Sequence, residues 1–162
     1  MRIFSTLALM VSFLQPAAAQ EVVLGAGFSD FARNEAIDSV VLSGELRSAS
    51  LASLLGADVT AFAVLDVHVE GDGFAGIGLA ARWPVGVGGW FVDAGVAPGV
   101  YNAGKSGNFL GRDLEFRSHL GVGRKMANGH AWSLAVLHKS NADTGKINPG
   151  MNTALLRWHR GF

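Results

Sequence analysis

The stretch that decides the fold is Met151–Phe162, with the sequence MNTALLRWHRGF. Side chains of a β-strand point alternately to its two sides, so every second residue shares a face. One face of this stretch holds Ala154, Leu156, Trp158 and Phe162, with Arg160 as the exception; the other holds Leu155, Arg157, His159 and Gly161. An apolar face that ends in an aromatic residue, opposite a more polar face, is the pattern of a membrane-spanning strand.

The same alternation recurs along the chain between turn residues such as Gly71-Asp72-Gly73 and Ala127-Asn128-Gly129. It predicts strands at about 21–28, 39–49, 58–70, 74–83, 88–98, 110–124, 130–140 and 151–162. Several of these reach the ~9–11 residues that a tilted membrane strand needs, whereas soluble strands usually have ~5–6. We therefore expect an all-β fold, an eight-stranded antiparallel transmembrane β-barrel. A soluble lipocalin-like barrel or sandwich is the alternative.

The terminal Phe162 also resembles the C-terminal signature of bacterial outer-membrane proteins, which the barrel-assembly machinery reads. That resemblance covers only the last strand, and Arg160 departs from its pattern. It implies an integral protein of the outer membrane, with the barrel-assembly machinery as a partner during biogenesis.

Residues 1–19 predict export. Met1-Arg2 is a short positive region, Ile3–Leu14 is almost wholly apolar, and Ala17-Ala18-Ala19 fits a small-residue cleavage site. The apolar run is too short for a membrane helix of ~20 residues. We therefore interpret 1–19 as a cleaved signal peptide and 20–162 as the barrel.

Composition narrows the function. The formal net charge of zero gives no electrostatic footprint for nucleic acid, so we expect no nucleic-acid partner. The absence of Cys removes disulfides and thiolate metal sites. The hydrophobic share of 49% suits either a soluble core or an outward, lipid-facing wall.

One local pattern carries the elements of nucleophilic catalysis: His138-Lys139-Ser140-Asn141. His138 and Ser140 share a face of the predicted strand, so the imidazole can approach the hydroxyl and take its proton during attack on a carbonyl. They continue the apolar stripe of Trp132, Leu134 and Val136, so they are expected to face lipid. Polar groups are costly there, which favours a functional role.

Topology predicts the depth of this pair in the membrane. In eight-stranded bacterial barrels both termini are periplasmic, and the longer loops lie outside the cell. The strand at 130–140 then ascends to the surface, and Ser140 lies near its outer end, at the depth of the lipid A portion of lipopolysaccharide.

The pattern His-x-Ser-Asn, a short loop and then Asn148-Pro149-Gly150 resembles the PagL-type lipid A 3-O-deacylases. The resemblance covers roughly the last 30 residues and implies a serine esterase of the outer membrane that removes the 3-position acyl chain of lipid A, without a metal or other cofactor. It implies that Ser140 is the nucleophile and His138 the general base. It also implies that Asn148 helps form the oxyanion hole and that Asn141 supports the site less directly.

One position departs from the family pattern. The acidic residue of the family's His-Ser-Glu triad falls twelve positions after the serine, and this chain has Asn152 there. Asn can hold a histidine tautomer but cannot stabilise imidazolium by charge. This predicts a weakened esterase with Asn152 as third member, a substitute acid such as Asp143 in the neighbouring loop, or a non-catalytic structural or lipid-binding barrel. Glu115 is expected to point inward.

The remaining polar residues are interpreted structurally. We expect His68, His119, His130 and His159 to line the barrel or lie in turns, since they have no metal-ligand spacing. Glu45, Arg47, Asp66, Glu70, Glu115 and Arg117 are expected to form an interior polar network. A third hypothesis is that the protein is a soluble periplasmic barrel that binds lipid.

Overall fold

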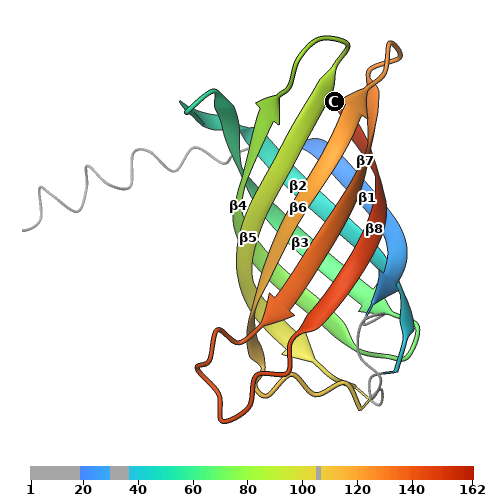
Figure 1. The fold of residues 1–162 in the computed structure, drawn as a ribbon, viewed down its shortest axis with the longest axis vertical. Helices are drawn as coiled ribbons and strands as arrows, with labels where there is room; N and C mark the ends of the chain where they lie inside the picture. The colour runs from blue at the N-terminus through green and yellow to red at the C-terminus, as the bar shows by residue number, and fades with distance from the viewer. Residues whose placement is uncertain (1–18, 30–36, 105–106) are drawn as a thin grey trace, which may run out of the picture.

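A computed structural model describes residues 19–29, 37–104 and 107–162 as a single closed sheet of eight antiparallel strands (Figure 1). The strands are β1 (Ala19–Ser29), β2 (Ser39–Leu54), β3 (Ala57–His68), β4 (Gly73–Pro84), β5 (Trp90–Asn102), β6 (Leu114–Lys125), β7 (His130–Ser140) and β8 (Met151–Gly161). Each strand pairs with its neighbours in sequence, and β1 pairs with β8. The predicted eight-stranded antiparallel barrel is confirmed, whereas the expected signal segment lies almost wholly outside the described residues.

The wall of this barrel is apolar outside and polar inside. Along β7, Trp132, Leu134 and Val136 are exposed, while the alternate residues are buried in the lumen. On β8, Arg157 and His159 point inward and Leu156 points outward, as the last strand predicted. A soluble lipid carrier would need the opposite arrangement, with an apolar lumen. No helix in the described part of the chain is long and apolar enough to cross a membrane.

Buried ion pairs fill the lumen. Arg47 binds Asp93 at 2.6 Å and Glu45 at 2.7 Å, and Arg117 binds Asp66 at 3.0 Å and Glu45 at 3.1 Å. Glu45, Arg47, Asp66 and Arg117 therefore form the interior network that was predicted. Each of these buried charges has a partner of opposite sign, which offsets the cost of removing it from water.

Two members of that predicted network behave differently. Glu115 is buried inside as expected, yet its two carboxylate oxygens have no hydrogen-bond partner among the described residues. The prediction for Glu70 was wrong: it is exposed in the turn after His68, where β3 has already ended.

The two ends of the barrel differ. Short turns follow β2, β4 and β6 at the end where β1 begins and β8 finishes, and there the Phe162 N–H donates to the Gln20 carbonyl at 3.0 Å. Longer segments follow β5 and β7 at the other end, at the foot of Figure 1. This is the division between periplasmic turns and outer loops found in bacterial membrane barrels.

Candidate active site

His138 and Asn152 lie directly opposite each other on the neighbouring strands β7 and β8. The His138 Nδ1 atom is 2.8 Å from the Asn152 Oδ1 atom. Because an amide oxygen only accepts, this contact requires Nδ1 to carry the proton and leaves the Nε2 lone pair free. The imidazole is therefore held in the tautomer that a general base needs.

Ser140 lies two residues further along β7 and is half-buried on the same outward side as His138. Its strand neighbour on β6 is Phe116. The hydroxyl makes no hydrogen bond with His138 within the described residues; such contacts in a free enzyme are often long and tighten when substrate binds. The structure thus brings the predicted pair to one face of one strand without joining them directly.

Gly150 closes the site on the side of the imidazole. Its φ of +66° is in the left-handed region, and a Cβ atom there would lie 2.9 Å from the His138 Cε1 atom and 3.4 Å from its Nε2 atom. A side chain at this position would push the ring away. The sequence indicated Gly150 only as part of the Asn148-Pro149-Gly150 pattern, because its contact with His138 depends on the pairing of β7 with β8.

Lys139, between the two candidate catalytic residues, anchors the strand from the other side. Its side chain is fully buried in the lumen, where the Nζ atom lies 2.9 Å from an Asp66 carboxylate oxygen and 3.3 Å from the His68 Nε2 atom. This ion pair holds the inward face of β7 at the point where the outward face carries His138 and Ser140.

The loop between β7 and β8 is tied together by its asparagines. The Asn141 N–H donates to the Asn148 Oδ1 atom at 3.1 Å, and the Asn141 amide donates to the carbonyls of Leu110 and Ile147 at 2.9 and 2.8 Å. The Asn148 amide donates to Asp143 at 2.9 Å. Because an amide nitrogen has two hydrogens, Asn148 keeps one for another acceptor.

Asp143 is engaged in this loop, and Asn152 is the residue that contacts the imidazole. Of the two candidates for the third position, the structure therefore brings Asn152 to His138 and pairs Asp143 with Asn148.

A second loop braces the first. The Arg112 guanidinium, in the segment before β6, donates to the Thr144 carbonyl at 2.7 Å. Gly111, with a φ of +102°, approaches so closely that a Cβ atom there would lie 2.2 Å from the Ile147 carbonyl oxygen. Neither residue was singled out in the sequence, because no motif marks a contact between two loops so far apart in the chain.

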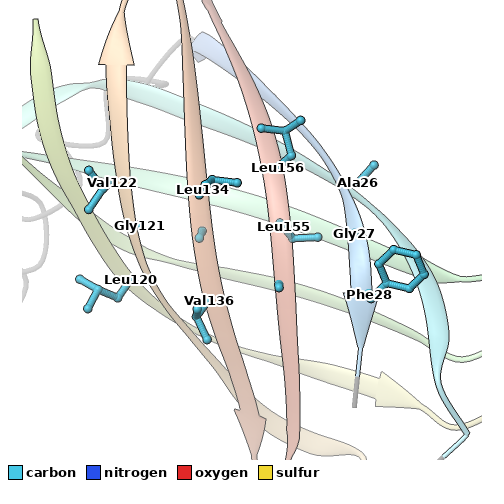
Figure 2. A pocket seen from close by; sticks show the side chains of 12 residues that line it. Ala26, Gly27, Phe28, Leu120, Gly121, Val122, Leu134, Val136, Leu155 and Leu156 are labelled. Atoms are coloured by element: carbon cyan, nitrogen blue, oxygen red, sulfur yellow. The ribbon is translucent and has the colours of Figure 1, made fainter. Parts of the chain in front are cut away.

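An apolar groove of about 640 Å³ lies on the outer wall of the barrel (Figure 2). It spans β6, β7, β8 and β1, and its lining includes Leu120, Gly121, Val136, Ala154 and Gly27. Val136 and Ala154 are the next outward residues below His138 and Asn152, and they pair across the strands. The small residues hollow the wall, so an apolar groove begins one outward residue away from His138 and Asn152.

The other histidines lie elsewhere. His68, His119 and His159 are buried in the lumen, whereas His130 stacks on Trp158 with ring centroids 5.3 Å apart. Among the described residues, no group of three or more His, Asp or Glu side chains is arranged to hold a metal ion.

Comparison with known proteins gives one family. The family model described as PagL, lipid A 3-O-deacylase, matches residues 50–160. No curated protein sequence matches the chain. The crystal structure of the outer membrane enzyme PagL is similar with a TM-score of 0.70 and 18% identity, covering 88% of this chain and 99% of that chain. A de novo designed transmembrane β-barrel is similar with a TM-score of 0.57 and 9% identity, covering 91% of this chain and 98% of that one. At these identities the two structures establish the fold.

Proposed function

Because this chain belongs to the PagL lipid A 3-O-deacylase family, we propose that it is an outer-membrane esterase whose catalytic residues are Ser140, His138 and Asn152. The observation that carries the assignment of residues is the 2.8 Å contact between His138 Nδ1 and Asn152 Oδ1 on the lipid-facing wall. A histidine facing lipid, held in the tautomer of a base two residues from a serine, has no evident structural purpose.

The reaction follows from these positions. The His138 Nε2 atom takes the Ser140 hydroxyl proton while the Ser140 oxygen attacks the ester carbonyl at the 3-position of lipid A. The second amide hydrogen of Asn148 stabilises the developing oxyanion. Imidazolium returns the proton to the sugar oxygen as the ester C–O bond breaks. Water then attacks the acyl-serine, and a 3-hydroxy fatty acid is released.

The depth of the site supports this substrate. Trp132, near the periplasmic end of β7, and Ser140 are eight residues apart, which is about 26 Å along a strand and about 20 Å along the axis of a barrel with strands tilted by ~40°. The apolar band of such barrels is about 25 Å tall. Ser140 is therefore near the outer edge of the band, at the level of the sugar-linked esters of the outer leaflet.

The groove supplies a place for the acyl chain. It is apolar, begins just beneath His138 and runs toward the middle of the membrane. We propose that the chain to be removed lies there, with the scissile ester at Ser140.

Residues 1–19 are proposed to be a signal peptide that is cleaved during export, and the barrel-assembly machinery is proposed to insert the chain through its last strand. Replacement of the C-terminal Phe162 by Ala, with the amount of barrel recovered in the outer-membrane fraction as readout, tests the second proposal; an unchanged amount contradicts it.

The test of function uses the folded protein with purified lipopolysaccharide and mass spectrometry of lipid A. The expected result is loss of one hydroxyacyl chain with the wild type and no loss with Ser140→Ala. Ser118→Ala is the matched control, because Ser118 is an outward serine opposite His138 on β6 whose hydroxyl donates to the His138 backbone carbonyl at 3.4 Å and has no proposed role in the reaction.

Asn152 also favours a second candidate, a lipid-binding barrel that has lost catalysis, because the triad lacks its charge. Intact lipid A at every pH, with a folded barrel that retains lipopolysaccharide on vesicles, would support that candidate and overturn the esterase.

A further inference from the structure

Polar side chains on the lipid-facing wall of β6, β7 and β8 fall into two groups at opposite ends of the barrel. The group near the outer end is the candidate active site with Ser118. The group near the periplasmic end consists of Arg124, His130 and Arg160. The catalytic proposal gives no role to this second group, which contains the residue that broke the apolar pattern of the last strand.

The two arginines are unusual for their positions. Among the strand residues that the structure describes, Arg124 and Arg160 are the permanently charged side chains at outward-facing positions of the alternating wall. Asp58, Arg82 and Lys125, at the same end, line the mouth of the lumen instead. A charge that faces lipid is costly unless it reaches a partner at the interface, and an anionic headgroup is such a partner.

Aromatic residues surround these arginines. All four tryptophans of the chain, Trp83, Trp90, Trp132 and Trp158, lie at this end of their strands. Arg124 pairs with Trp90 on one side and Trp132 on the other, and Trp132 pairs with Trp158. Tryptophan prefers the level of the lipid headgroups, so this row marks the periplasmic interface of the membrane.

Arg124 is held ready for a ligand. Its Nε–H donates to the Gly88 carbonyl at 3.1 Å, and its guanidinium carbon lies 5.6 Å from the centre of the Trp90 ring. The two terminal nitrogens have no hydrogen-bond acceptor among the described residues, and the Arg160 side chain has no ion-pair partner there. A guanidinium with free, fixed donors matches the geometry of a phosphate.

An apolar hollow of about 230 Å³ leads away from Arg124 into the wall. Trp90, Trp132, Val122, Leu134 and Leu156 line it, and the last three also line the long groove beneath His138. The two hollows are therefore contiguous. The hollow beside Arg124 has a cationic end at the interface and an apolar trough toward the middle of the membrane. These two parts match the charged headgroup and the acyl chain of a phospholipid.

We propose that the outer face of β5–β8 binds an anionic phospholipid of the periplasmic leaflet, with its phosphate at Arg124 and Arg160 and an acyl chain in the hollow between Trp132 and Leu156. The site is independent of catalysis and is present in a protein whose Ser140 is removed. Its charge makes it selective, because the outward wall around it offers two positive side chains and no acidic one among the described residues.

The tryptophans provide the test, because all four report from this end. The protein is folded into vesicles of phosphatidylcholine that contain a brominated test lipid. The test lipid is either phosphatidylglycerol or phosphatidylcholine, brominated near the ester end of its acyl chains, and both are used at the same mole fraction. Bromine quenches tryptophan fluorescence on contact. The association constant derived from quenching is expected to be about fivefold or more larger for brominated phosphatidylglycerol than for brominated phosphatidylcholine. The reason is that each basic residue near the interface contributes roughly 1 kcal/mol toward binding of anionic lipid.

The double variant Arg124→Gln, Arg160→Gln is expected to bring the two lipids to equal quenching, and Arg160→Gln alone to reduce the preference partially. Arg160→Gln keeps the experiment decisive if the double variant does not fold, because no described ion pair is lost with it. Arg112→Gln, at the opposite end, is the matched control and should keep the wild-type preference. Equal quenching by both lipids in the wild type, or an undiminished preference in folded Arg160→Gln, overturns the proposal.

Discussion

Replacing Asn152 by Asp tests the catalytic assignment most directly, because the change adds a charge and keeps the shape of the side chain. The Asn152 Oδ1 atom already lies 2.8 Å from the His138 Nδ1 atom, so a carboxylate oxygen in its place needs no rearrangement. Asn152→Asp would stabilise the imidazolium that forms when Ser140 attacks, and the substrate ester in the ground state would gain nothing from it.

The size of the effect follows from the geometry. Charge centres about 4 Å apart attract by roughly 4 kcal/mol at an effective dielectric constant of ~20. His138 is exposed and Asn152 only half-buried, so solvent and headgroups screen the pair, and about half of this energy is expected to remain. About 2 kcal/mol corresponds to an increase in kcat of roughly 30-fold.

The assay is the initial rate of 3-hydroxy fatty acid release from lipopolysaccharide in mixed micelles. Asn152→Glu, which restores the residue of the family pattern, should also raise kcat, and Asn152→Ala should lower it by about 100-fold because the ring loses its orientation. Ser140→Ala in the Asn152→Asp background should be inactive. A folded Asn152→Asp enzyme with unchanged or lower kcat, or an Asn152→Ala enzyme as active as the wild type, would refute the role of Asn152.

Three further variants test the surroundings of the site. Gly150→Ala should lower kcat by about 10- to 100-fold, because the added Cβ atom would displace the His138 ring. The free energy of unfolding should fall by only about 1–2 kcal/mol, the cost of a Cβ atom at a φ of +66°. Kinetics and urea unfolding measure the two effects, and full activity of the variant would contradict the contact between Gly150 and His138. Asp66→Asn should destabilise the barrel by about 3–5 kcal/mol, because Lys139 would keep a buried charge without its carboxylate and Arg117 would keep only Glu45 of its two carboxylate partners. An unchanged urea midpoint would argue against that network. Asn141→Ala should lower the stability of the loop at 141–150 by about 1–3 kcal/mol, because the hydrogen bonds of the Asn141 amide are lost. Backbone amides of the loop should then exchange hydrogen faster than in the wild type, and an unchanged exchange rate would show that these bonds do not hold the loop.

The strands could be predicted from sequence because alternation is a strong signal in a wall with one apolar face. The strand at 130–140 is found with the predicted bounds, and the last strand differs by one residue. The errors occur where loops interrupt the pattern. The sixth strand begins at Leu114 and not near Leu110, because Leu110 gives its carbonyl to Asn141 and Gly111 adopts a positive φ.

The second strand shows a different kind of error. It runs on to Leu54, beyond the predicted end near residue 49, because two register shifts after Arg47 carry it through the break in alternation. A bulge changes which side chains face inward, so a period-2 pattern cannot follow the strand past it.

The candidate site was predictable only in part. The face shared by His138 and Ser140 follows from alternation within one strand, and the resemblance supplied the partner at Asn152. The contacts of Gly150, Arg112 and Lys139 depend on pairing between strands and on the packing of loops. No spacing in the sequence encodes those distances.

The lumen packed with ion pairs has a consequence for how the enzyme meets its substrate. Arg47, Asp93, Arg117 and Asp66 occupy the interior, so the barrel offers lipids no axial passage between its two ends through these residues. Lipid A must arrive sideways by diffusion within its leaflet, and the freed fatty acid must depart the same way. Turnover is then governed by the surface mole fraction of lipid A, so that adding inert detergent slows the reaction even when the bulk amounts of enzyme and lipopolysaccharide stay fixed.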